Sequence, residues 1–455
     1  MSSRFRDAIG PAYLFLCLIL GGSAQGAWGN MTLQLLGLVL LVWAASAPQA
    51  EKPARASSRL LIMAIVAIAY VALQAVPLPP GVWTGLGGRA AIAEGYRILG
   101  VETPWLPISV APYLSLATLL TLIPPLALFC TIVTLRAYRP SWLAAALIVG
   151  TIAGVLLGAL QVSGGGGDVP SRWYLYRESS FGFATGFFAN ANHMAGLLVS
   201  TIPFLAALLT SARSANRQRN SAIIAGVAGA GLLILVGIAL NHSLAAYLLT
   251  LPVLGISALI AVPRRSRWRK WAIGSAAVIL AAGLGAVWTD SFRNGPFGSD
   301  TATSVGSRQE MLATTAEAIG DFMPWGSGLG SFQDVYHLYE KPAEVTNTYV
   351  VHAHNDYAEL ALELGLAGVL LILAFLAWWT GQAWTAWRFA DASAYSRAAA
   401  VTSGAMLIHS LVDFPLRTAA LAAVLAMCLA LLVERRTSVV RTKSDLWPTR
   451  HVVLR

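Results

Sequence analysis

Charged residues are scarce in this chain: 11% of its 455 residues are Asp, Glu, Lys or Arg, and 56% are hydrophobic. This composition excludes a soluble globular protein, in which about 25% of the residues are charged. Cysteine is also rare, and Cys17, Cys130 and Cys428 all lie in apolar runs. Their placement predicts small buried side chains and argues against a disulfide framework.

Metal-ligand patterns are missing from the sequence as well. It contains no Asp-x-Asp motif, no His-x-x-x-His motif and no cluster of cysteines and histidines. Proteins bind zinc through closely spaced Cys and His side chains, and they bind magnesium mainly through carboxylates. We therefore predict a protein that uses no metal ion and no other cofactor.

Long apolar runs are abundant instead, and most are 17 to 25 residues long. A helix rises 1.5 Å per residue, so such a run can cross a hydrocarbon core about 30 Å thick. The runs lack the short alternating segments of an outer-membrane barrel. We predict an all-α polytopic membrane protein with about twelve transmembrane helices, near residues 9–26, 32–48, 59–76, 112–135, 141–163, 191–211, 221–240, 243–262, 271–289, 357–383, 397–412 and 417–433.

The basic residues are distributed unevenly among the segments that join these helices. If both termini are cytoplasmic, the segments on that side hold 23 of the 31 Lys and Arg residues but 5 of the 21 Asp and Glu residues. Cytoplasmic loops of membrane proteins are enriched in Lys and Arg. The bias predicts cytoplasmic termini, a large periplasmic loop at 290–356 and a location in the bacterial inner membrane. The basic rim would face the anionic lipid bilayer, so the net charge of +10 requires no nucleic acid partner.

The longest outer segment, 290–356, contains a predicted helix and a predicted turn. Residues 307–323 carry apolar side chains at helical spacing, and the glycine-rich "PWGSGLGSF" follows at 324–332. A second outer segment contains "AIAEGYRILG", for which we expect a short interfacial helix at 91–100. The apolar face of the longer helix is expected to consist of Leu312, Ala316, Ile319 and Met323.

The stretch "VVHAHNDYAELALELGLAGVLL", residues 350–371, concentrates ionisable groups at the start of an apolar helix. Asn355, Glu359 and Glu363 are four residues apart, so they share one face of that helix. Asn355 or Asp356 can cap its first turn. Glu363 would lie about 12 Å below the helix start, where an unpaired carboxylate is costly. The pattern favours a polar stripe along a watery cavity, and the alternative is a solvated outer turn.

Two histidines, His352 and His354, directly precede this helix at the water boundary. A histidine there can accept a proton from a hydroxyl near neutral pH, or it can simply hydrogen-bond a loop. Polar residues also occur at the outer ends of other predicted helices, in "FANANHMAGLL", "NHS" and "HSLVDFPLR", the last containing His409 and Arg417. Each one alone is equally well explained as a helix cap, but together they predict a polar chamber on the outer face. Its members would be Asn190, Asn192, His193, His352, Asn355, Glu359, Glu363 and Asp413.

Several of these motifs together resemble a known family. "GFFANANHMAGLL", "SRQEML", "PWGSGLGSF" and "HAHNDYAELALELGLAG" resemble, in order and spacing, the bacterial O-antigen ligase and O-antigen polymerase family of membrane glycosyltransferases. "HSLVDFPLR" is similar to relatives that polymerise exopolysaccharide. The resemblance covers about 180–420. We therefore divide the chain into N-terminal helices with periplasmic loops (1–180), a catalytic membrane region (181–433) and a basic cytoplasmic tail (434–455).

The resemblance implies a fold like that of the C-type glycosyltransferases, with an active site at the periplasmic face. It implies a metal-independent enzyme that takes a glycan from undecaprenyl diphosphate and joins it to a hydroxyl of an acceptor. The acceptor would be a growing glycan for a polymerase, which we favour slightly, or lipid A-core for an O-antigen ligase.

By motif matching, the resemblance implies that His354 and Arg308 are catalytic. The chain departs from its relatives at two places: many of them carry Arg or Pro where it has Ala191, and an Arg in the outer hairpin that here reads Asn-His-Ser at 241–243. We therefore assign the donor diphosphate to arginines of the outer face, because their forked N–H groups match phosphate oxygens. These arginines are Arg172, Arg177, Arg308 and Arg417.

Two other classes of function stay open. A transporter or flippase of lipid-linked glycans would place ionisable groups near the bilayer midplane, whereas here they gather at one face. A scaffold that binds envelope assembly proteins would leave the histidines, arginines and asparagines of that face without a role. The pattern favours surface chemistry.

Overall fold

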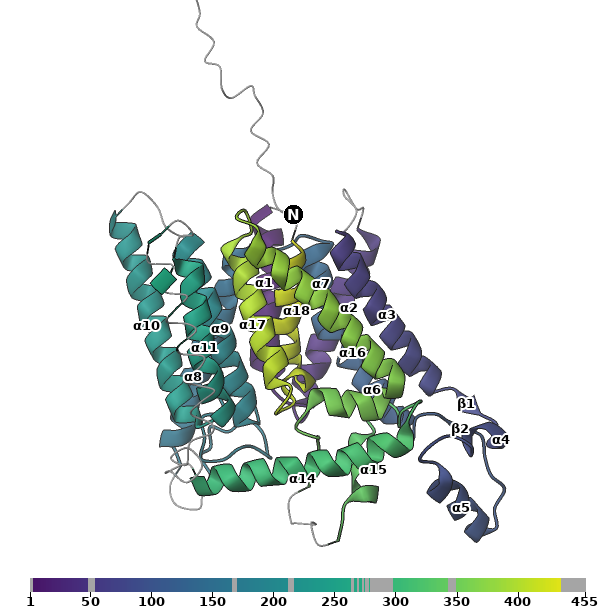
Figure 1. Cartoon of the computed structure of the whole chain (residues 1–455). Coiled ribbons are helices and arrows are strands. Elements are labelled where there is room, and N and C mark those ends of the chain that lie inside the picture. The colour runs from purple at the N-terminus through teal and green to yellow at the C-terminus, as the bar shows by residue number, and fades with distance from the viewer. Residues whose placement is uncertain are drawn as a thin grey trace, which may run out of the picture.

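The computed structural model describes residues 3–47, 54–165, 170–211, 217–262, 298–342 and 349–434, with a few positions between 266 and 278. These residues form a bundle of roughly parallel helices with smaller elements at one end (Figure 1). The elements are α1 (Ser3–Leu20), α2 (Ala27–Ser46), α3 (Arg55–Gln74), β1 (Pro77–Leu78), α4 (Pro80–Trp83), α5 (Ala90–Leu99), β2 (Leu106–Pro107), α6 (Pro112–Leu120), α7 (Ile123–Val133), α8 (Pro140–Ser163), α9 (Ala191–Ser211), α10 (Arg217–Asn241), α11 (Leu244–Ala261), α14 (Gly298–Phe322), α15 (Phe332–Tyr339), α16 (Asp356–Arg388), α17 (Ala394–His409), the 3₁₀ helix η1 (Pro415–Arg417) and α18 (Ala419–Val433).

Eight of the described segments are long and apolar enough to cross a membrane. They confirm a multi-pass helical membrane protein but not the predicted count of twelve. Three predicted spans are helices that miss this criterion: α1, which starts with charged residues, and the short helices α17 and α18. The helix predicted at 271–289 lies outside the described residues, apart from isolated positions.

The centre of the bundle is α18, which is buried along nearly its whole length. It packs against α1, α7 and α17, and α17 in turn packs against α9 (Figure 1). Alanine is abundant in α17 and α18, and small side chains let helix backbones approach closely where no hydrophobic effect drives association. One core therefore joins the first and last helices of the chain. The division of the chain at residue 180 stays a prediction.

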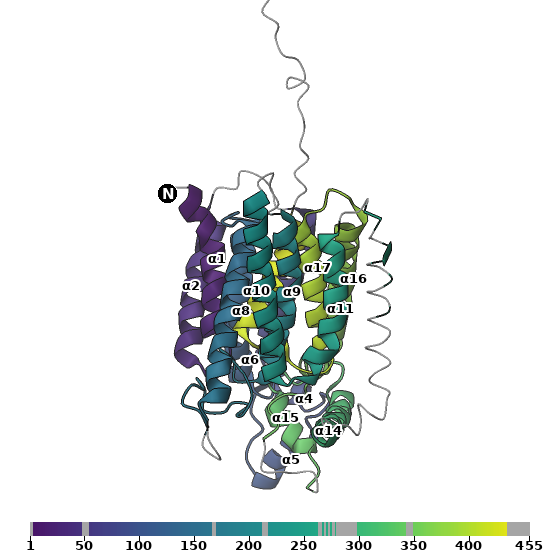
Figure 2. The ribbon, with the colours of Figure 1, turned by 90° about the vertical axis from the view of Figure 1, so that its left-hand side faces the viewer.

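The end of the bundle opposite the N-terminus carries α4, α5, α14 and α15 (Figure 2). There α14 lies across the ends of the upright helices, as Figure 1 shows. The predicted helices at 91–100 and 307–323 are confirmed as α5 and as part of α14. The side of the membrane that this end faces stays a prediction.

The predicted apolar face of α14 is wrong at two of its four residues. Of the other two, Ile319 packs against a small buried cluster and Met323 is half-buried. Leu312 and Ala316 are exposed, whereas Ala318 and Phe322 are buried in a small cluster with residues of α15 and α16. The buried face also includes Thr314 and Thr315, so threonines take part in the contact where leucine was expected.

A glycine-rich turn after α14 inserts into a break in α16. Gly365 has φ 59° and ψ −144°, which interrupts the helix. The amide of Gly328 donates to the Glu363 carbonyl at 2.9 Å, and the amide of Leu366 donates to the Pro324 carbonyl at 2.9 Å. A Cβ atom on Gly365 would lie 2.2 Å from the Pro324 oxygen, so only glycine fits. The turn thus satisfies backbone groups that the break would leave unpaired.

Candidate active site

The candidate site lies where residues 350–356 meet the connection between α17 and α18. His354 Nδ1 is 2.9 Å from the Oδ1 atom of Asp413. The Asp413 side chain is buried, and the His354 side chain is 25% exposed. His354 has φ +49°, a left-handed conformation that few residues other than glycine adopt. The contact with Asp413 and the backbone conformation together fix the direction of the imidazole ring.

Two further histidines surround the same carboxylate. His409 Nε2 and His193 Nε2 lie 3.7 and 4.0 Å from Asp413 Oδ2, and none of these three atoms has a hydrogen-bond partner among the described residues. Burial acts to raise the pKa of Asp413, but the hydrogen bond with His354 and the nearby histidines hold it below its ordinary value. Asp413 is therefore ionised throughout the neutral pH range.

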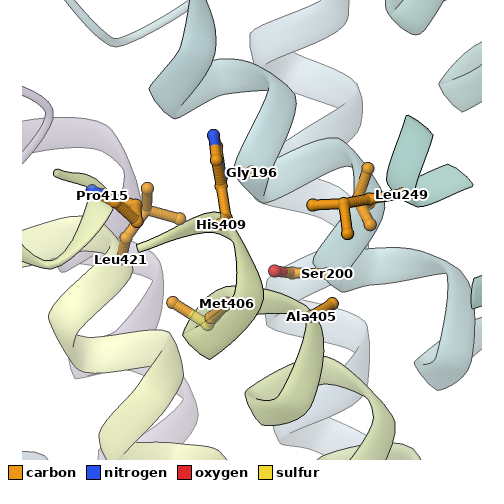
Figure 3. Close-up of a pocket in the computed structure, with 9 residues that line it drawn as sticks. Gly196, Ser200, Leu249, Ala405, Met406, His409, Pro415 and Leu421 are labelled. Atoms are coloured by element: carbon orange, nitrogen blue, oxygen red, sulfur yellow. The ribbon is translucent and has the colours of Figure 1, made fainter. Parts of the chain in front are cut away.

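His409 lies in the contact between α17 and α9. Figure 3 shows its ring beside Gly196, at a small pocket that is also lined by Ser200, Met406 and Leu421. A Cβ atom on Gly196 would approach His409 Nδ1 to 3.2 Å, so glycine makes room for the ring.

Phe414 provides the apolar wall of the cluster. Its ring centroid lies 4.2 Å from that of His352, 4.9 Å from that of His354 and 5.0 Å from that of His193. Phe414 was not among the predicted site residues, and His409 was named in "HSLVDFPLR" but not as a member of the predicted chamber. His409 lies four residues before Asp413 in "HSLVDFPLR", and this spacing is the signal that could have placed His409 in the chamber.

The predicted polar stripe on α16 is buried at its two glutamates. Glu359 and Glu363 share one face and are 1% and 0% exposed, so the alternative of a solvated outer turn is wrong for them. Asn355 is the helix cap: its Oδ1 accepts from the amides of Tyr357 and Ala358, both at 3.0 Å. Its Nδ2 donates to the Leu411 carbonyl at 3.0 Å, which ties the helix start to the connection after α17.

Arg417 lies among three carboxylates of α16. Its Nη2 is 3.2 Å from Glu359 and 3.1 Å from Glu363, and its Nε is 3.6 Å from Asp356. Burial acts to lower the pKa of Arg417, but the three carboxylates raise it above its ordinary value. Its predicted contact with a donor diphosphate stays a prediction.

The other predicted arginines have different surroundings. Arg308 on α14 is half-buried, makes no hydrogen bond or ion pair with the part of the chain that the structure describes, and lies close enough to His409 for an electrostatic interaction. Arg172 is exposed and lies against the ring of Trp173. Arg177 is 95% exposed, with Glu178 at 3.8 Å. Among the described residues, neither Arg172 nor Arg177 contacts the histidine cluster.

Asparagines at the start of α9 and at the end of α10 organise the neighbouring backbone. Asn190 Oδ1 accepts from the Asn192 amide at 2.8 Å, and Asn192 Oδ1 accepts from the Ser243 hydroxyl at 2.8 Å. Asn241 donates to the Ala191 carbonyl at 2.7 Å. These bonds connect α9 to the turn between α10 and α11. They also fix the first turn of α9, which carries His193, the ring that lies 4.0 Å from Asp413.

Comparison with known protein families gives a match in the middle of the chain. Residues 228–373 match the family model for O-antigen ligase. The family resemblance is confirmed. The O-antigen ligase match includes Arg308 and the stretch from His352 to Glu363, and it excludes His193, Asp413 and Arg417. It supports a membrane glycosyltransferase of the O-antigen ligase or polymerase type at the level of the family. No curated protein matches the chain.

Proposed function

We propose that the protein is a glycosyltransferase of the bacterial inner membrane that acts at the periplasmic face. It transfers or polymerises glycan repeat units from an undecaprenyl-diphosphate donor onto an acceptor hydroxyl, in the synthesis of a surface polysaccharide or O-antigen. The observation that carries the proposal is the contact between the buried Asp413 carboxylate and the partly exposed His354. His354 lies within the residues that match the O-antigen ligase family.

The geometry supports a role for His354 as a general base. With Asp413 as a permanent acceptor, the Nδ1 atom of His354 carries the proton and Nε2 keeps its lone pair. Nε2 takes the proton of the acceptor hydroxyl while the hydroxyl oxygen forms a bond to the anomeric carbon of the donor. The bond from that carbon to the diphosphate breaks, and its electron pair leaves with the diphosphate. Asp413 stabilises the imidazolium that forms.

The leaving diphosphate needs positive charge, and Arg308 is the best-placed candidate. Its charge is not neutralised by any described residue, and it lies close enough to His409 for an electrostatic interaction. A guanidinium offers two parallel N–H groups to phosphate oxygens. Arg172 and Arg177 lie before α9 and could add contacts farther along the donor.

We favour polymerase over ligase because "HSLVDFPLR" contributes both His409 and Asp413 to the cluster, and this motif is the one similar to exopolysaccharide polymerases. One feature favours a transporter: the break in α16, since transporters often have discontinuous helices. In this chain, however, the break is filled by the backbone of the glycine-rich turn.

The test is a transfer assay with protein purified in detergent. The protein is incubated with a lipid-diphosphate-linked repeat unit alone, and products are separated by size. A ladder of products that is absent with His354→Ala would establish polymerisation. Product that forms only when lipid A-core is added would establish a ligase. No transfer to either acceptor would overturn the proposal.

A further inference from the structure

We propose that Arg417 is a positioning residue: through Glu359 it holds the strained segment that carries His354, and it does not bind the donor diphosphate. This inference rests on the proposed role of His354. It changes the role that the sequence predicts for Arg417.

The first support is the set of partners around the guanidinium. Three carboxylates from successive turns of one helix converge on Nε and Nη2 of Arg417, and its side chain is 16% exposed. Like charges at this spacing repel one another, more strongly when buried. Arg417 therefore allows the acidic face of α16 to pack against η1.

The second support is the path from Glu359 to the histidines. Its Oε1 atom faces Arg417 and is also 2.8 Å from His352 Nδ1. Its Oε2 atom accepts the amide proton of Ala353 at 3.1 Å, directly before His354. The carboxylate that Arg417 holds in place thus holds the two residues on the N-terminal side of His354.

The third support is the backbone of His354. A left-handed conformation is strained for a residue other than glycine, and it persists only where the surroundings enforce it. On its C-terminal side, the amide of Asp356 donates to the Ser410 carbonyl at 3.0 Å and the Asn355 side chain donates to Leu411. On its N-terminal side, Glu359 supplies the hydrogen bonds to His352 and to the Ala353 amide, beside the contact of the His352 ring with Phe414, and Arg417 fixes Glu359.

Electrostatics also argue against a diphosphate at Arg417. A diphosphate that approached Nη2 of Arg417 would come close to Glu359 and Glu363, whose carboxylates already form ion pairs with that nitrogen. Two anions would then compete for one cation, and the repulsion would offset most of the attraction.

The test separates turnover from donor binding. Arg417→Met is assayed at varied concentrations of the lipid-diphosphate-linked repeat unit, beside the exposed control Arg97→Met. The proposal predicts that kcat falls about 10²-fold, as expected when a catalytic group is misplaced by about 1 Å, with a donor KM within about twofold of the wild-type value. Adding Glu363→Gln to Arg417→Met should recover about tenfold in kcat, because one repelling charge is removed.

Two results would overturn the inference. One is a donor KM that rises about tenfold or more in Arg417→Met with little change in kcat, which is expected of a phosphate ligand. The other is a double variant no more active than Arg417→Met. If Arg417→Met does not accumulate, Glu359→Gln replaces it: the proposal then predicts a lower kcat at unchanged donor KM, and an unchanged kcat would refute it.

A stability measurement keeps this inference separate from the proposed function. The apparent Tm of each variant in detergent requires no substrate. Arg417→Met should lower the Tm and Glu363→Gln should raise it again in that background, even if wild-type protein shows no transfer. Without that recovery the carboxylates are not what Arg417 neutralises, and the positioning role fails independently of the enzyme assay.

Discussion

At the scale of single residues, the site is organised around one ionised aspartate. Asp413 contacts His354 at hydrogen-bond distance and has two more histidines within 4.0 Å. A buried carboxylate is stable only when it is paired, and here histidine rings supply much of the compensation. Because His354 is the partly exposed member, it is the ring that a substrate hydroxyl can reach.

Replacing His354 by alanine should lower transfer by about 10² to 10⁴-fold, the usual contribution of general-base catalysis. The matched control is His352→Ala, two residues away, whose ring faces Glu359 instead of Asp413. It should lose much less activity. Wild-type turnover in His354→Ala, or greater loss in His352→Ala, would show that the base has been assigned to the wrong histidine.

Asp413→Asn should also lower transfer, because an amide can donate to Nδ1 and stabilise the wrong tautomer of His354. The pKa of Asp413 is below its ordinary value, so its contribution to stability is complete above about pH 4 and is lost only as the pH falls through the folded-state value. The difference in apparent Tm between wild type and Asp413→Asn should therefore stay constant from pH 8 to pH 5. A difference that shrinks over that interval would mean that another group titrates.

Arg308→Lys should lose much of the activity although the charge is kept, because lysine cannot offer two parallel N–H groups to phosphate oxygens. We expect the loss to be mainly a higher KM for the donor, measured in the same transfer assay. Equal activity of Arg308→Lys and wild type would reduce Arg308 to a surface residue of α14.

At the scale of elements, local patterns predicted where helices form better than which face each one buries. The helix at 307–323 and the cap at Asn355 follow from spacing and capping chemistry, and both are present. The face of α14 was mispredicted in part because a threonine can be buried on a helix: the Thr315 hydroxyl donates to the Met311 carbonyl at 2.7 Å, so its polar group is satisfied. The insertion of the glycine-rich turn could not be predicted, because it is a contact between two backbones and leaves no side-chain pattern.

The same insertion predicts a large difference between two glycines of α16. Gly365→Ala should destabilise the protein by about 1–3 kcal/mol, since alanine is strained at φ 59° and its Cβ would collide with Pro324. Gly381→Ala is the control: nothing lies within 4 Å of its Cβ position, and alanine favours the helix. Apparent Tm values in detergent give the comparison, and similar values for the two variants would show that the break in α16 tolerates a side chain.

At the scale of the whole molecule, hydropathy was sufficient to predict the class and insufficient to predict the packing. Helices that are apolar on all sides, such as α18, give no signal for which neighbours they contact, so the shared core of α1, α7, α17 and α18 could not be derived. The polar groups were easier to assign to one site, because few exist and most lie at the helix ends that the charge bias assigns to the outside. Their partners, such as Arg417 with the α16 carboxylates, depend on contacts between segments about 60 residues apart, which spacing within one helix does not reveal.

The orientation of this arrangement is the prediction that decides whether the site faces the periplasm. The end with α14 and α15 lies opposite the N-terminus, and the charge bias assigns that end to the outside (Figure 2). Leu338→Cys on α15 should therefore react with a membrane-impermeant thiol reagent in intact spheroplasts, while Ala390→Cys, between α16 and α17, should react only after lysis. Wild-type protein is the control, because Cys17 and Cys428 are fully buried and Cys130 is partly buried. Labelling of Ala390→Cys but not of Leu338→Cys in intact spheroplasts would invert the topology and move the proposed chemistry to the cytoplasmic face.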